Sequence, residues 1–136
     1  MGYSSSIDGS IEGVSEESFA LIRQDLECIF VEVSWHPETV KESRDPSGQV
    51  KKTVINKGGA LEIHSHGKHN EKWLHAVYDK IAFCIDEGGG GYLEYEGEET
   101  CDIRCVFFTT RLWKEAWIEV AYPQNPFIQN DAAGQF

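Results

Sequence analysis

Apolar residues recur at helical spacing in two segments of the chain. The first segment follows Ser15, which suits an N-cap, and its apolar stripe is Phe19, Ile22, Leu26 and Ile29. Residues 70–86 have a broader apolar face, which consists of Trp73, Leu74, Val77, Tyr78, Ile81, Cys84 and Ile85. Asn70 can cap this second segment. The spacing therefore predicts helices over residues 15–28 and 70–87.

Elsewhere apolar and polar residues alternate, which is the spacing of half-buried strands. The alternation predicts strands over residues 3–13, 29–36, 50–56, 60–66, 91–96, 101–109 and 112–122. Residues 57–59 are Lys-Gly-Gly, and we expect a hairpin turn there between the third and fourth of these strands. Residues 37–49 hold prolines and charged residues and are expected to form an exposed loop. We expect the glycines of residues 88–91 to stop the second helix.

The predicted order of elements is β-α-β-β-β-α-β-β-β. Runs of strands between two helices favour an antiparallel sheet, because a parallel sheet needs a helix after nearly every strand. The expected fold class is α+β: a single, mostly antiparallel sheet of five or six strands with two helices packed on one face. We expect one domain over residues 1–122 and a loosely ordered C-terminal tail over residues 123–136, where Pro123 and Pro126 follow the last strand.

The cysteines and the apolar runs of the chain indicate its cellular compartment. The four cysteines form no C-x-x-C pair, and Cys101 and Cys105 would lie about 13 Å apart on a straight strand, too far for a disulfide. No apolar run approaches about 18 residues, and the first residues lack the basic and apolar parts of a signal peptide. These features predict a cytoplasmic protein with free thiols and no membrane contact.

Charge narrows the choice of partners. The chain has 23 acidic and 12 basic residues, so its net charge is −11. Phosphate backbones would be repelled, and we expect no nucleic-acid binding. The charge has two interpretations: it keeps the protein soluble, or it faces a basic protein partner.

The histidines are the first candidates for chemistry. Residues 61–66 alternate, so Glu62, His64 and His66 would point from one face of a strand. Two imidazoles so placed can bind one zinc ion, and His69 or His75 could add a third ligand. The simpler interpretation is a solvated polar strand face without metal. We expect no cofactor, with zinc as the alternative.

A second set of candidates lies in the last third of the chain. Trp113 and Trp117 share a face of the last predicted strand and would line a pocket or an interface if the helices cover the other face. Glu94 and Glu96 share a face of their strand, opposite Tyr95. We assign these five residues to a candidate interface or pocket, and expect a homodimer that contains Trp113 or Trp117 in its interface.

Two short stretches resemble a known group of proteins. Met1-Gly2-Tyr3 with Gly9 and Ile11 resembles the start of some small bacterial and phage proteins of unknown function. The helix that contains Trp73-Leu74, followed by residues 91–98, resembles their second half. The resemblance covers about a third of the chain. It implies no activity, and suggests an accessory protein encoded by a mobile element.

No strong catalytic motif appears. The sequence has no G-x-S-x-G elbow, and the glycine run at residues 88–91 leads from a helix into a strand, the reverse of a phosphate loop. The sequence therefore favours a non-catalytic binding or accessory protein that acts through contacts with itself or with a protein partner. The alternative is a metal-dependent enzyme or small-molecule-binding protein that uses His64 and His66.

Overall fold

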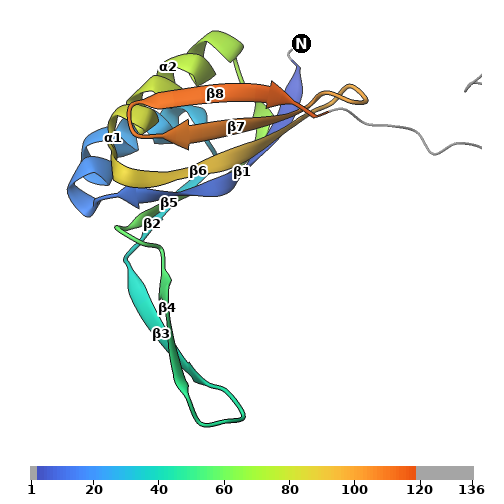
Figure 1. Ribbon diagram of the computed structural model, residues 1–136. Coiled ribbons are helices and arrows are strands. Elements are labelled where there is room, and N and C mark those ends of the chain that lie inside the picture. The colour runs from blue at the N-terminus through green and yellow to red at the C-terminus, as the bar shows by residue number, and fades with distance from the viewer. Residues whose placement is uncertain (1–2, 119–136) are drawn as a thin grey trace, which may run out of the picture.

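The computed structural model describes residues 3–118, and it has the predicted α+β fold. Six strands form one antiparallel sheet in the order β2-β5-β1-β6-β7-β8, and β3 and β4 form a separate hairpin (Figure 1). The strands are β1 (Ser4–Val14), β2 (Glu32–His36), β3 (Thr39–Arg44), β4 (Val50–Ile55), β5 (Ala60–Lys68), β6 (Ile85–Gly97), β7 (Ile103–Thr109) and β8 (Leu112–Trp117). The helices are α1 (Glu16–Ile29) and α2 (Glu71–Phe83). The expected tail, residues 123–136, lies outside the described residues.

Both helices begin at the expected caps. The Ser15 side chain accepts a hydrogen bond from the backbone N–H of Ser18, and the Asn70 side chain accepts one from Trp73. Each cap satisfies a backbone donor that has no partner inside its helix. Within residues 3–118, neither helix is long and apolar enough to cross a membrane.

The core lies between the two helices and one face of the sheet. Alternate strand residues on that face are buried against the helices, and they include Ile7, Ile11, Leu61, Ile63, Leu93, Val106 and Phe108. The residues between them point the other way, to a face that we call the open face. Its side chains include Asp8, Glu32, Glu62, His64, His66, Tyr92, Glu94, Glu96, Phe107, Leu112 and Lys114. Among the described residues, both helices lie on the opposite side of the sheet (Figure 1).

The glycine run at residues 88–91 belongs to strand β6, so its expected role as a helix stop is wrong. Helix α2 ends at Phe83, and β6 begins two residues later. A Cβ atom on Gly91 would lie 2.4 Å from the backbone oxygen of Ser10, and one on Gly9 would lie 2.3 Å from that of Tyr92. Glycine at these places therefore lets β1 and β6 approach closely.

The hairpin expected between residues 50–56 and 60–66 is also wrong. Strand β4 pairs with β3, inside the segment expected to be a loop, and β5 pairs with β1 and β2. The β3–β4 turn is fixed by Asp45, whose Oδ1 accepts hydrogen bonds from the backbone N–H groups of Ser47 and Gln49. We call residues 37–59, which contain this hairpin, the arm. Figure 1 shows its two strands projecting from the rest of the domain.

Candidate functional site

The candidate histidines of β5 do not come together. His64 lies on the open face, where its Nδ1 is 2.9 Å from Asp8 Oδ1 and its Nε2 is 2.9 Å from Glu62 Oε2. Hydrogen bonds to these carboxylates raise the pKa of His64, since they stabilise the protonated ring. When it is protonated, the ring donates from both nitrogens and has no lone pair for a metal ion.

His66 and His69 lie on different sides of the sheet. His66 is exposed on the open face, and its Nδ1 is 2.7 Å from Ser6 Oγ. The ring of His69 lies on the helix side, with one nitrogen 2.7 Å from Ser5 Oγ and the other 2.8 Å from Ser65 Oγ. The structure therefore does not assemble the alternative zinc site of His64, His66 and His69, because β5 ends before His69 and the chain turns to the other side.

The tryptophans of β8 face the helices, contrary to the expectation that they line an uncovered face. Trp113 is half-buried, its ring centroid lies 5.2 Å from that of Tyr78, and its Nε1 donates to Asp79 Oδ1 at 2.7 Å. Trp117 is 61% exposed, but its ring centroid lies 4.3 Å from the guanidinium carbon of Arg104. Tyr95 is buried, and its ring centroid lies 4.2 Å from the same carbon.

Arg104 is the centre of a polar cluster that sequence reasoning missed. This buried side chain donates hydrogen bonds to Glu71, to Asp102 at 3.1 Å and to Glu115 at 3.3 Å. Burial alone would lower the pKa of Arg104, but the hydrogen bonds to Glu71 and Asp102 outweigh it and raise the pKa. The guanidinium is therefore a permanent charge that joins α2, β7 and β8.

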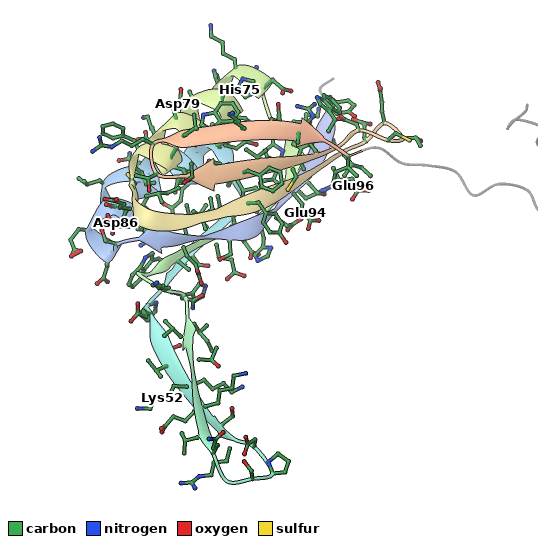
Figure 2. The ribbon with its side chains drawn as sticks, viewed as in Figure 1. Lys52, His75, Asp79, Asp86, Glu94 and Glu96 are labelled. Carbon is green, nitrogen blue, oxygen red and sulfur yellow. The ribbon has the colours of Figure 1, made fainter. Side chains whose placement is uncertain are left out.

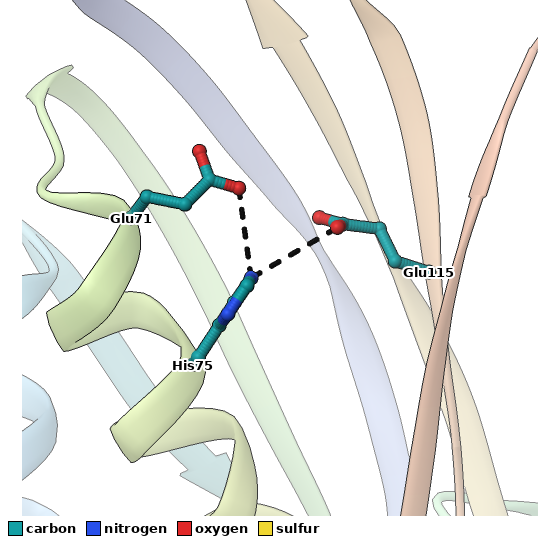
Figure 3. A group of neighbouring side chains, drawn as sticks. All are labelled: Glu71, His75 and Glu115. Carbon is teal, nitrogen blue, oxygen red and sulfur yellow. Dashed lines mark ion pairs between the residues drawn. The ribbon is translucent and has the colours of Figure 1, made fainter.

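His75 lies beside this cluster. Glu71, His75 and Glu115 each offer a ligand atom, and these atoms lie within 4.8 Å of one another (Figure 3). Among the described residues this is the group of histidine, cysteine and carboxylate side chains that could hold a metal ion. The separation of four residues between Glu71 and His75, at the start of a helix, was the sequence signal available; nothing in the sequence pointed to Glu115 as the third member.

The open face has two halves of different chemistry. Toward β8 it is apolar: Tyr92, Phe107 and Leu112 are 48%, 51% and 51% exposed, and the rings of Tyr92 and Phe107 lie 6.1 Å apart. Toward β2 it is polar and acidic, and Glu94 and Glu96 lie on it near the boundary (Figure 2). Of the five candidate interface residues, these two glutamates are therefore the ones on the open face.

Comparisons with known proteins add no relative. No family model matches the chain, and no curated protein or solved structure matches it. The resemblance to bacterial and phage proteins accordingly stays a prediction.

Proposed function

We propose that this protein is a non-catalytic binding protein that acts through self-association, with the arm of one copy lying on the open face of another. The observation that carries the proposal is the exposed apolar patch of Tyr92, Phe107 and Leu112. Phe107 stands directly opposite Tyr92 in the sheet, and Leu112 is its diagonal neighbour on β8. Three large apolar side chains gathered on one exposed surface are typical of a protein contact.

The arm supplies the second surface. Val40, Val50 and Val54 lie on one face of the β3–β4 hairpin, and they are about half exposed. An isolated two-stranded hairpin is marginally stable in water. Burial of this valine face against another chain would stabilise the arm.

Charge favours a second copy as the occupant. The arm carries five of the twelve basic residues of the chain against three acidic ones. These basic residues are Lys41, Arg44, Lys51, Lys52 and Lys57. The open face carries the acidic residues Asp8, Glu32, Glu62, Glu94 and Glu96, with Lys114 near its β8 edge. Figure 2 shows Lys52 on the arm and Glu94 on the body of the domain. On the valine face of the hairpin Arg44 and Lys52 outnumber the single acidic residue Glu42, whereas Lys41 and Lys51 lie on its other face. The valine face therefore matches the open face in both apolar character and charge.

Sedimentation equilibrium tests the proposal. We expect the wild-type protein to dimerise at about 100 μM, because standard interfaces bury about 1,600 Å². Phe107→Asp should make it monomeric, and Arg44→Glu combined with Lys52→Glu should weaken the dimer, since both lie on the valine face. Raising the salt concentration should weaken it as well, since the Debye length is about 8 Å at physiological ionic strength and falls further above it.

Leu21→Asp is the matched control. Leu21 is 81% exposed on α1, outside both the arm and the open face, so its replacement should leave the dimer intact. A monomer at every concentration would overturn the proposal. A dimer that survives Phe107→Asp but dissociates in Leu21→Asp would also overturn it, because it would place the interface on the helices.

A further inference from the structure

Two buried polar atoms near the α2–β8 contact have no hydrogen-bond partner among the described residues: His75 Nε2 and the Tyr78 hydroxyl. His75 Nε2 lies 3.5 Å from Glu71 Oε1 and 3.9 Å from Glu115 Oε1 (Figure 3). Both distances exceed those of a normal N–H···O hydrogen bond. A buried polar atom without a partner costs free energy, and an ion is one of the groups that can remove that cost.

The Tyr78 hydroxyl is the second buried polar atom without a partner within residues 3–118. The Tyr78 side chain is fully buried, and it follows His75 by three residues, which places both on one face of α2. Burial, and then the negative charges of Glu115 and Glu71, raise the pKa of Tyr78. The hydroxyl is therefore neutral, and it donates to neither of these carboxylates.

The charges of the cluster also leave room for a cation. Three carboxylates, those of Glu71, Asp102 and Glu115, surround the single guanidinium of Arg104. With His75 neutral, the cluster has two negative charges in excess. Glu115 uses Oε2 for Arg104 and presents Oε1 to His75, so Glu115 Oε1 is free to bind a cation. Glu71 Oε1 faces His75 but also accepts a hydrogen bond from Arg104, so it would bind the ion while keeping that bond.

We infer that Glu71, His75 and Glu115 form a binding site for a divalent transition-metal ion such as zinc. Zinc bonds of about 2.0–2.2 Å place neighbouring ligand atoms about 3–4 Å apart, which matches the separations around His75 Nε2. One imidazole nitrogen and two carboxylate oxygens suit zinc and its neighbours in the first transition series better than calcium or magnesium. The ion would join α2 to β8, the strand at one edge of the sheet, and so stabilise that edge.

Metal titration of chelator-treated protein tests the inference. Isothermal titration with zinc chloride should give one site per chain, and magnesium chloride should give none. His75→Gln and Glu115→Gln should each weaken zinc binding by at least about tenfold, because replacing only a hydrogen-bond partner of a metal ligand already costs about that much. Glu115→Gln keeps an oxygen that can accept from Arg104, so this variant should stay folded. The control replaces both His64 and His66 with Gln and should bind zinc as the wild type does.

Fluorescence gives a second readout. The Trp113 and His75 rings lie 5.1 Å apart, so a cobalt ion at the site should quench Trp113. This cobalt-dependent decrease in fluorescence should be absent in Trp113→Phe and in His75→Gln. The inference is wrong if the wild type takes up no zinc. It is equally wrong if folded His75→Gln and Glu115→Gln bind zinc with wild-type affinity, or if the loss occurs in the His64 and His66 control instead.

Discussion

The two faces of the six-stranded sheet come from alternate residues of the same strands, and their charged side chains differ in burial. On the helix side, buried Arg104 is enclosed by three carboxylates and lies between the rings of Tyr95 and Trp117. On the open face, His64 pairs with Asp8 and Glu62, and all three side chains are at least a third exposed. Water screens the second set of pairs, whereas in the first set it reaches mainly Glu71, whose side chain is half exposed.

This difference separates the polar groups that specify the packing of the fold from those that can contact another molecule. Removing one partner of a buried ion pair leaves an uncompensated charge, whereas exposed pairs contribute about 0–1 kcal/mol. The charges around Arg104 therefore specify how α2 packs on β7 and β8. The charges of the open face contribute little to the fold and are free to contact another molecule.

The largest expected difference is between two neighbours on β6. Leu93 is fully buried on the helix side, and Tyr92 is half exposed on the open face. Leu93→Ala should lower the free energy of unfolding by about 3 kcal/mol, since it leaves a cavity in the core. Tyr92→Thr should change it by less than about 1 kcal/mol, because threonine also suits a strand. Urea denaturation of the protein at a concentration too low for dimerisation measures both; equal losses would mean that another segment of the same chain buries Tyr92.

The next difference is between two basic residues. Arg104→Met should lower the free energy of unfolding by about 2 kcal/mol; the full cost for a buried pair is larger, but Glu71 is half exposed. Lys114→Met on the open face should change it by no more than about 0.5 kcal/mol.

A double variant checks the cause of the Arg104 effect. Glu115→Gln should destabilise Arg104→Met less than it destabilises the wild type, because it removes one of the charges left unpaired. Additive losses in chemical denaturation would show that Arg104 acts by packing alone.

The smallest expected effect concerns two histidines on opposite faces. Hydrogen bonds to Glu62 and Asp8 raise the pKa of His64 above 6.5, whereas burial and then His66 lower that of His69 below 6.5. The contribution of His64 to stability is therefore complete below pH 6.5 and is lost as the pH rises through its folded pKa. That of His69 is complete above pH 6.5 and is lost as the pH falls through its folded pKa.

Histidine NMR titration measures both pKa values. His64→Gln should remove the loss of stability above pH 6.5 and leave the acid side unchanged. A His64 pKa below that of His69 would contradict the assignment of faces.

Local signals predicted the elements that have caps and strict periodicity. Ser15 and Asn70 fix the starts of both helices, and the alternation in β1, β5 and β7 gives the buried face correctly. Strand β4 of the arm was predicted, but β3 was missed because residues 39–44 bury nothing, so a strand there has no apolar alternation to reveal it. The turn residues at 45–49, which form the tip of the hairpin, indicated a loop, and the segment expected to be that loop contains β3.

The candidate sites were harder to predict because they depend on contacts far apart in sequence. The approach of Glu115 to His75 joins residues from β8 and α2, and no spacing in the sequence encodes it. Trp113 and Trp117 were correctly placed on one face of a strand, but alternation alone cannot say which face the helices cover. His69 lay outside the alternation that located His64 and His66.

Strand β1 lies in the middle of the sheet, between β5 and β6. During translation β1 is made before the other strands of this sheet, but its second neighbour, β6, is complete only when Gly97 has been added. Until then the nascent chain has an unpaired edge along its most central strand, and such edges attract other chains. Pairings this distant in sequence also form slowly. Protection by a chaperone should therefore matter most while residues 15–97 are being translated.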